Sequence, residues 1–480
     1  MKPARARLMT RAAPPVSGPC PREVGIPPDY ARRGPIIRGM NIIGVRHEDK
    51  NRWERRVPLT PAAVASLVGQ EELDVRVQSS DRRVFDDAAY AEAGATVVAG
   101  LDGCDVVLAV KEIPAELLRP DTAYVFFSHT IKGQAHSMPL LQRVLDVGAT
   151  LIDYELIVDA DGRRLVHFGR FAGLAGMVDA LWAFGQRWHE LGVQTPFLRL
   201  RQAFEYESLV QALAAVADVG TTIAAEGLPP EVGPLVVGVT GYGNVAGGVG
   251  EVLDRLPRVD VPAGELTAEL IRATPTTSVF VTVFTEQDTV ARRDGAAFTA
   301  AEFAADPGAF RSIFAPAAAQ LSILVNSVLW QPQAPRLLSV AELAGLQQGA
   351  GVGAGGSRLA LIADLSCDIE GGIEATVRAT TSDDPVFVYD PQTGAATPGF
   401  GGDGVAILAV DNLPCEFPRD ASEAFSDALA GFVAPLAAAD FGADFDQLDL
   451  PAELRAAVVA HRGRLTPRFA HLAGRLPQHR

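Results

Sequence analysis

Lysine is rare in this chain, and two of its lysines lie on either side of a histidine. Only four of the 42 basic residues are lysine, so a fixed cation is supplied by arginine almost everywhere. Lys111 and Lys132 nevertheless flank His129. A lysine ammonium is compact and its pKa shifts readily on burial, and histidine titrates near neutral pH. The retained lysines suggest a need for a compact amine that can titrate or donate along one direction, although a single histidine after a strand also fits a capped or solvated loop residue.

Other ionisable residues follow predicted strands of the same region. Arg56 lies in the turn before a helical pattern, Glu112 follows Lys111, and Glu155 and Arg164 come after the apolar run near residue 150. Ligands of open parallel sheets bind beyond the carboxyl ends of the strands. Together these residues therefore indicate a site for a small molecule with several charges. Taken singly, Glu155 also fits a helix cap and Arg164 a surface residue.

Short apolar runs alternate with helical patterns from residue 41 onward, which is typical of parallel sheets covered by helices on both faces. A second run of this kind begins near residue 234, and a long apolar stretch over 171–191 predicts a helix joining two domains. We therefore expect an α/β fold with two Rossmann-like doubly wound domains and an active-site cleft between them. The expected parts are a disordered N-terminal extension (1–36), a substrate-side domain (37–168) completed by C-terminal helices (420–480), and a dinucleotide-binding domain (169–419).

A glycine-rich turn opens the second domain. Gly241 and Gly243 precede Asn244 and Val245 in a GxGxxA pattern that follows a predicted strand and begins a helix. Such a turn lets the backbone approach a pyrophosphate, whose charge is held by the free amides of the helix. The alternative is a plain tight turn, because the chain has 46 glycines. The acidic residue expected about 20 positions later is ambiguous, since Asp260 is accompanied by nearby arginines, and the residues themselves leave NAD and NADP open.

Composition limits the classes of partner. The net charge of −16 and the pI near 5.0 argue against nucleic acid and anionic membrane surfaces. The four cysteines are far apart, which predicts a reduced, cytoplasmic protein without disulfides or a metal site. No apolar run is expected to reach the roughly 18 residues of a membrane span.

Several segments together resemble the lysine–ketoglutarate reductase family. These are saccharopine dehydrogenases of the lysine-forming type, relatives of alanine dehydrogenase and of the transhydrogenase nucleotide-binding subunit. The resemblance covers roughly residues 40–470, and its segments include AVKEIP, YVFFSHTIKGQ, VTGYGNV, LIADLSCDIEGGIE and AVDNLPCEF. It implies that L-lysine condenses with 2-oxoglutarate and that NAD(P)H reduces the imine to saccharopine, as the first step of lysine degradation. NADP(H) is expected rather than NAD(H), and a homo-oligomer is compatible with the family.

The resemblance also assigns roles to residues. Lys111 and His129 are the acid–base pair, and Glu112 is expected to favour the charged form of Lys111. The expected substrate contacts are Arg56, which clamps a carboxylate, and Glu112, Lys132, Glu155 and Arg164. The expected cofactor contacts are Gly241, Gly243, Asn244, Val245, Ser366, Asp368 and Asp411.

The sequence departs from the family pattern in two respects, and two other functions are alternatives to the expected one. Fungal members carry a lysine near the position of Asn51, whereas here Lys50 is displaced by one residue. No saccharopine-oxidising domain is present in the chain, so a separate enzyme is expected to consume the product. The alternatives are an alanine-dehydrogenase-like amino acid dehydrogenase and a non-catalytic protein that senses NAD(P) or lysine.

Overall fold

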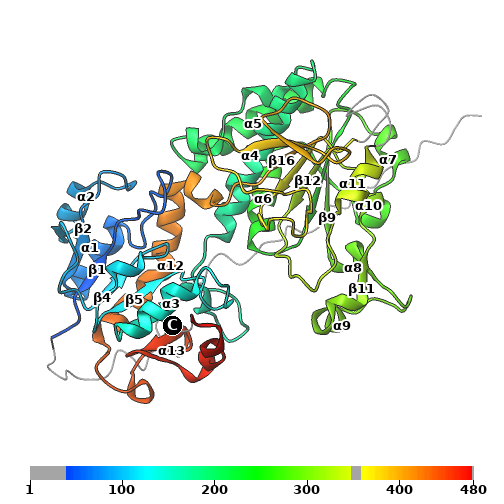
Figure 1. The fold of residues 1–480 in the computed structure, drawn as a ribbon. Helices are drawn as coiled ribbons and strands as arrows, with labels where there is room; N and C mark the ends of the chain where they lie inside the picture. The colour runs from blue at the N-terminus through cyan, green and yellow to red at the C-terminus, as the bar shows by residue number, and fades with distance from the viewer. Residues whose placement is uncertain (1–38, 348–357, 478–480) are drawn as a thin grey trace, which may run out of the picture.

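The protein folds around two eight-stranded sheets, which form two lobes in the computed structural model (Figure 1). The structure describes residues 39–347 and 358–477, so the extension expected over 1–36 lies outside the described residues. The two Rossmann-like α/β lobes predicted from the sequence are confirmed.

The first sheet has the strand order β18-β17-β6-β5-β4-β1-β2-β3. β1 to β6 are parallel to one another, and β17 and β18 extend one edge in antiparallel pairing. The C-terminal segment therefore contributes two strands as well as the expected helices. The strands are β1 (Ile43–Val45), β2 (Val75–Gln78), β3 (Thr96–Val98), β4 (Val106–Leu108), β5 (Ala123–Phe126), β6 (Thr150–Asp153), β17 (Val458–His461) and β18 (Arg464–Leu465).

Helices with clear start signals cover this sheet. Pro61 is the first residue of α1, and the Thr60 hydroxyl accepts a hydrogen bond from the Ala63 amide, which caps the helix. α12 packs against α1, where Ser422 and Ser426 accept hydrogen bonds from the Val57 and Thr60 amides. The helices are α1 (Pro61–Gln70), α2 (Asp87–Glu92), α3 (Met138–Asp146), α12 (Pro418–Ala438) and α13 (Ala452–Ala456).

The second sheet has the order β15-β14-β16-β13-β12-β7-β9-β8, with β14 and β15 antiparallel to the rest. β9, and not β8, lies beside β7, although β8 comes first along the chain. The strands are β7 (Leu235–Thr240), β8 (Arg258–Asp260), β9 (Val279–Phe284), β12 (Ile323–Asn326), β13 (Leu361–Asp364), β14 (Val386–Asp390), β15 (Ala395–Pro398) and β16 (Val405–Leu408). A small separate pair is formed by β10 (Val290–Arg292) and β11 (Phe310–Ser312).

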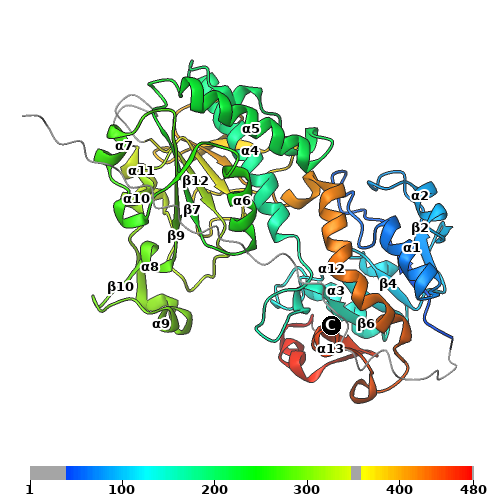
Figure 2. The same cartoon turned by 180° about the vertical axis from the view of Figure 1, so that it is seen from behind.

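Helices lie on both sides of the second sheet, as the views from front and back show (Figures 1 and 2). They are α4 (Gly169–Glu190), α5 (Leu209–Glu226), α6 (Asn244–Leu253), α7 (Ala268–Ala273), α10 (Ala315–Ala318) and α11 (Val340–Leu346). The short helices α8 (Glu286–Thr289) and α9 (Ala300–Ala305) lie with β10 and β11 in a protrusion beside the sheet (Figure 1).

α4 and the start of α12 join the lobes. Phe168, just before α4, stacks on Phe425 of α12 with ring centroids 4.4 Å apart. Trp53 of the first lobe contacts Phe204 at 4.7 Å, and Arg52 pairs with Asp383 at 2.7 Å. One continuous apolar core accordingly includes residues of both sheets.

α5 corrects one expectation drawn from the sequence. Its 18 residues are long and apolar enough, by length and composition, to cross a membrane. One third of the helix is buried, and the buried residues recur every three or four positions, which places them on one face: Leu209, Ala212, Val216, Val219, Gly220 and Ile223. This pattern is typical of an amphipathic helix that packs on a globular core.

Candidate active site

The carboxyl ends of β4, β5 and β6 bring the predicted acid–base residues to one edge of the first sheet. The three strands are adjacent and in parallel register. Lys111 and Glu112 follow β4, His129 follows β5, and Glu155 follows β6. Because parallel strands end at the same edge, these residues from three separate segments are brought to one side of the sheet.

Glu112 and His129 form a hydrogen-bonded pair. The His129 Nδ1 lies 2.5 Å from Glu112 Oε1, and the Lys50 Nζ lies 3.6 Å from Glu112 Oε2. Burial would raise the pKa of Glu112, but the hydrogen bond and charge of His129, with the charge of Lys50, lower it to about 2. An ionised Glu112 holds the proton of His129 on Nδ1, which leaves Nε2 as the nitrogen that can exchange a proton.

The backbone of His129 is in the left-handed region, with φ of 53°. A residue other than glycine adopts this conformation at a cost in free energy, and such residues cluster at functional sites. Here the conformation accompanies the contact between the imidazole and Glu112. Glu112 contacts His129 and Lys50 directly, whereas its charge has only a minor effect on the pKa of Lys111.

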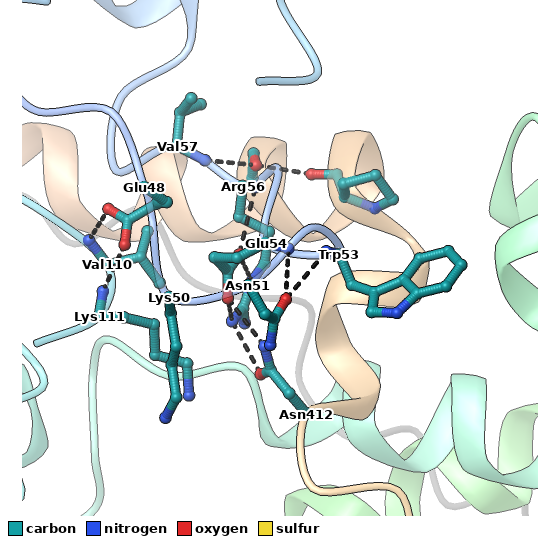
Figure 3. Close-up of polar contacts among 12 residues, drawn as sticks. Glu48, Lys50, Asn51, Trp53, Glu54, Arg56, Val57, Val110, Lys111 and Asn412 are labelled. Atoms are coloured by element: carbon teal, nitrogen blue, oxygen red, sulfur yellow. Dashed lines mark hydrogen bonds and ion pairs between the residues drawn. The ribbon is translucent and has the colours of Figure 1, made fainter. Parts of the chain in front are cut away.

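Lys111 lies in a setting that favours its neutral form. Burial lowers the pKa of Lys111, and the positive charges of Arg56 and Lys50 lower it further, against the opposite effects of Glu54 and Glu112. The Lys50 and Lys111 side chains extend in the same direction in Figure 3. A lysine of this kind can release and regain a proton closer to neutral pH than an exposed one.

Glu48 was not found by sequence reasoning, yet it positions Lys111. Its carboxyl group is buried and accepts hydrogen bonds from the amides of Val110 at 2.7 Å and Lys111 at 2.9 Å (Figure 3). Burial and the nearby charge of Glu54 raise the pKa of Glu48 to about 7. The only sequence signal was an acidic residue shortly after a buried strand, which is too common to be specific.

Arg56 is buried and already paired. Its guanidinium donates to Glu54 at 2.8 and 2.5 Å and to Asn412 Oδ1 at 3.0 Å, while Asn412 donates to Glu54 at 2.9 Å (Figure 3). It also lies 4.2 Å from the centre of the Phe168 ring. Arg56 therefore ties the loop after β1 to the chain before α12, and its expected role as a carboxylate clamp stays a prediction.

The other expected substrate contacts differ in their exposure and in whether they already form an ion pair. Glu155 is largely covered and pairs with the exposed Arg164. Lys132 is exposed and makes no ion pair within the residues that the structure describes. A cavity of about 480 Å³ beside Glu112 is lined by Lys50, Ser128 and His136 among others, and all of its lining residues come from the first lobe rather than from a cleft between lobes.

The glycine turn of the second lobe is open to solvent. Gly241 has φ of 87°, and Gly243, the N-cap of α6, has no atom within 4 Å of where a Cβ would stand. No side chain caps the first amides of α6, so they are free to bind an anion. Asn244 contacts His167 at 3.2 Å, and Val245 packs against α4, where a side chain at Gly173 would collide with its carbonyl. These features fit a dinucleotide pyrophosphate.

A polar network lies behind the turn. Asn326 at the end of β12 contacts Thr240 at 2.9 Å, Asp364 at 2.9 Å and Ser366 at 3.2 Å. Burial raises the pKa of Asp364, although its hydrogen bonds act in the opposite direction. Ser366 is thus part of the support of the turn rather than an isolated contact.

The remaining expected cofactor residues sit at the same edge of the sheet. Asp368 accepts a hydrogen bond from the Trp330 amide at 3.2 Å, and Asp411 is exposed directly before Asn412. Asp411 therefore directly precedes the residue whose side-chain amide is hydrogen-bonded to Glu54 and Arg56. Within residues 39–347 and 358–477, no group of His, Cys, Asp and Glu has the arrangement of a metal site.

Two family models match this architecture. The model for the alanine dehydrogenase/PNT N-terminal domain matches residues 44–175, and that for the C-terminal domain matches residues 310–468. Together they cover more than half of the chain. The chain belongs to the alanine dehydrogenase/PNT family. Members of this family are oxidoreductases that depend on a nicotinamide dinucleotide.

Curated relatives agree with this assignment. The chain is 38% identical to the α-aminoadipic semialdehyde synthase of Arabidopsis thaliana over 90% of its own length and 41% of the relative. It is 33% identical to the mitochondrial enzyme of that name from Rattus norvegicus, covering 92% of this chain and 49% of the relative. The chain thus spans less than half the length of these curated relatives. The saccharopine dehydrogenase [NAD(+), L-lysine-forming] of Neurospora crassa is 27% identical, covering 81% of this chain and 89% of the relative.

Solved structures of the alanine dehydrogenase/PNT family share the fold. An L-alanine dehydrogenase aligns with a TM-score of 0.56 at 21% identity, covering 90% of this chain and 99% of that chain. A transhydrogenase from Sinorhizobium meliloti aligns with a TM-score of 0.54 at 17% identity, covering 88% and 100%.

Proposed function

We propose that this chain is a lysine–2-oxoglutarate reductase. In this reaction the ε-amine of L-lysine condenses with the keto group of 2-oxoglutarate, and the imine is reduced to saccharopine, in the direction of lysine degradation. The observation that carries the proposal is the Glu112–His129 pair beside a lysine with a lowered pKa. The names of the plant, animal and fungal relatives support it.

The site residues suit the proton transfers of this reaction. The incoming amine has an ordinary pKa of about 10.4, so it must lose a proton before it attacks a carbonyl. The carbinolamine that forms must then gain a proton on oxygen to lose water. His129 can accept and return a proton at Nε2 while Glu112 holds Nδ1, and Lys111 can do so because its pKa is lowered.

Charged substrates suit the surroundings of this pair. The cavity beside Glu112 is lined by Lys50, and Lys132 lies exposed three residues after His129. Both are cations that can attract the carboxylates of 2-oxoglutarate, while Glu155 can attract an ammonium group. Arg56 and Arg164 complete the proposed substrate contacts.

The glycine turn is the proposed place of the nicotinamide dinucleotide. When bound, the cofactor supplies the hydride that reduces the imine. The amides after Gly241 and Gly243 would hold its pyrophosphate, and Asn244 and Val245 would flank it. Ser366, Asp368 and Asp411 are proposed to line the remainder. The fungal relative is named as an NAD(+) enzyme, which makes either nicotinamide dinucleotide a reasonable test ligand.

The test is oxidation of NADH and of NADPH in the presence of L-lysine and 2-oxoglutarate, singly and together. Turnover is expected only with both substrates. Pyruvate and ammonia in place of the pair distinguish an alanine-dehydrogenase-like enzyme, and nucleotide binding without any turnover distinguishes a sensor. Either result would overturn the proposal.

Three further expectations stay predictions. They are a cytoplasmic location, a homo-oligomeric state and a separate enzyme that oxidises saccharopine. Saccharopine formed by this chain would be detected by mass spectrometry of the reaction mixture.

A further inference from the structure

The strand order of the second sheet decides which acid can meet the cofactor's adenosine ribose. In dinucleotide-binding folds this acid stands at the carboxyl end of the strand beside the glycine-turn strand. Sequence spacing pointed to Asp260, at the end of β8. In the structure β8 is the edge strand, separated from β7 by β9.

The carboxylate of Asp260 is also already hydrogen-bonded to a neighbouring side chain. Its Oδ1 accepts hydrogen bonds from Arg258 Nε at 2.9 Å and Nη2 at 2.7 Å, and its side chain is 68% exposed. An exposed acid on the edge strand, neutralised by its own neighbour, is poorly suited to bind ribose hydroxyls near the turn.

β9 takes the position that β8 was expected to hold. It pairs with β7 from Leu235↔Val279 to Thr240↔Phe284. At the end of this pairing the Gly241 amide donates to the Phe284 carbonyl at 3.0 Å. The end of β9 therefore lies directly beside the glycine turn.

Glu286 follows β9 by two residues and reaches the turn. Both of its carboxylate oxygens lie 3.3 Å from the hydroxyl of Tyr242, the residue between Gly241 and Gly243. Tyr242 is 67% exposed, so it can contact a ligand as well. Glu286 is thus the acid that the tertiary structure brings to the ribose end of the site.

The charge around Glu286 bears on the choice of cofactor. Glu286 makes no ion pair in the part of the chain that the structure describes. Arg258 of β8 is paired with Asp254 and Asp260, and Arg292 of β10 is paired with Asp294 and Glu302. A 2′-phosphate of about two negative charges would be repelled by the Glu286 carboxylate.

We infer that Glu286 binds the hydroxyls of the adenosine ribose and makes the chain select NAD(H) over NADP(H). This reverses the preference expected from the sequence. The inference rests on the proposed function only in that the same turn holds the dinucleotide, and it does not depend on the identity of the amino acid and oxoacid.

The experiment measures equilibrium binding of NADH and NADPH by nucleotide fluorescence, without substrates. The unmodified chain is expected to bind NADH at least about tenfold more tightly, because like charges disfavour the phosphate. Glu286→Arg is expected to reverse the ratio, and Glu286→Gln to reduce it. Asp260→Arg is the matched control and is expected to leave the ratio unchanged.

Equal or tighter binding of NADPH by the unmodified chain would overturn the inference. So would a change of ratio in Asp260→Arg without one in Glu286→Arg. If Glu286→Arg does not fold, an unchanged ratio in Glu286→Gln gives the same negative answer. NADH selection without turnover of lysine and 2-oxoglutarate would contradict the proposed function alone.

Discussion

The two sheets end in polar edges of opposite character. At the first edge, charged side chains lie close together and are partly or wholly buried, with Glu112 against His129 and Glu54 against Arg56. At the second edge, an open glycine turn is backed by hydroxyl and amide groups and the Asp364 carboxyl group around Asn326. Both edges are built on parallel strands.

This difference separates proton transfer from ligand binding. Burial, together with the charges of Arg56 and Lys50, lowers the pKa of Lys111 at the first edge. Backbone amides do not titrate, so the amides of the glycine turn can bind an anion at any pH near neutrality. The following changes test whether each edge works in this way.

The largest effect is expected from Lys111→Met. Loss of an acid–base group lowers kcat by about 10²–10⁴-fold, whereas the binding of NADH should not change because the glycine turn is untouched. Steady-state kinetics and nucleotide titration measure the two quantities. Lys111→Arg should not restore kcat, because arginine stays protonated, while Lys132→Arg is the control that keeps a fixed cation. Normal kcat in Lys111→Arg would contradict the acid–base role.

A large effect on stability is expected from Arg56→Leu. The change leaves the Glu54 carboxylate buried without its partner, which costs about 3–5 kcal/mol of unfolding free energy. Urea denaturation measures the loss, and Glu54→Leu with Arg56→Leu should recover part of it. Arg163→Leu removes an exposed pair and serves as the control with little change. Equal stability of Arg56→Leu and Arg163→Leu would show that the buried pair is unimportant.

Gly243→Val tests the second edge. Nothing lies within 4 Å of a Cβ at this position, so the melting temperature should hold. The new side chain would stand where the pyrophosphate approaches, and loss of one hydrogen bond to a charged group costs about 1.5–3 kcal/mol, or roughly 10- to 150-fold in Kd. Gly247→Ala, also with open space, is the control for α6. Unchanged Kd in Gly243→Val would place the nucleotide elsewhere.

The smallest effect concerns two buried acids between the lobes. Asp179 of α4 accepts from the Ala203 amide at 2.7 Å, and Glu416 accepts from the Ser382 hydroxyl at 2.6 Å. Burial raises the pKa of Asp179 to about 6, and burial together with Asp179 raises that of Glu416 well above its usual range. Ionisation of both acids is therefore less favourable in the folded protein than in the unfolded chain.

Stability should consequently fall as pH rises. The unfolded chain releases these protons near pH 4, whereas the folded chain releases that of Asp179 near pH 6 and holds that of Glu416 more tightly than the unfolded chain does, so unfolding free energy is lost as pH rises. The slope is at most about 1.4 kcal/mol per pH unit for each proton. Glu416→Gln should flatten the slope measured by urea denaturation between pH 4.5 and 6.5, and the exposed Glu423→Gln should not. If the unmodified chain, Glu416→Gln and Glu423→Gln had identical slopes, burial of Glu416 would not be the cause of the pH dependence.

Local patterns predicted much of the fold. The apolar runs before Lys111 and His129 are strands, the stretch over 171–191 lies within α4 except for its last residue, and Gly241 begins a turn before a helix. Each of these depends on residues that are near one another in the chain. Burial of Glu48 and Glu54 had no such signal, because an acid in a loop is usually exposed.

The sequence by itself determined the kinds of element, the residues at the ends of the strands, and the scarcity of lysine that pointed to Lys111. Only the tertiary structure decided which of these residues meet. Asn412 reaches Glu54 across 358 positions, Lys50 reaches Glu112, and β9 displaces β8 from the side of β7, which brings Glu286 to the glycine turn. The physical reason is that strand neighbours are chosen by long-range packing, and spacing along the chain carries no record of that choice.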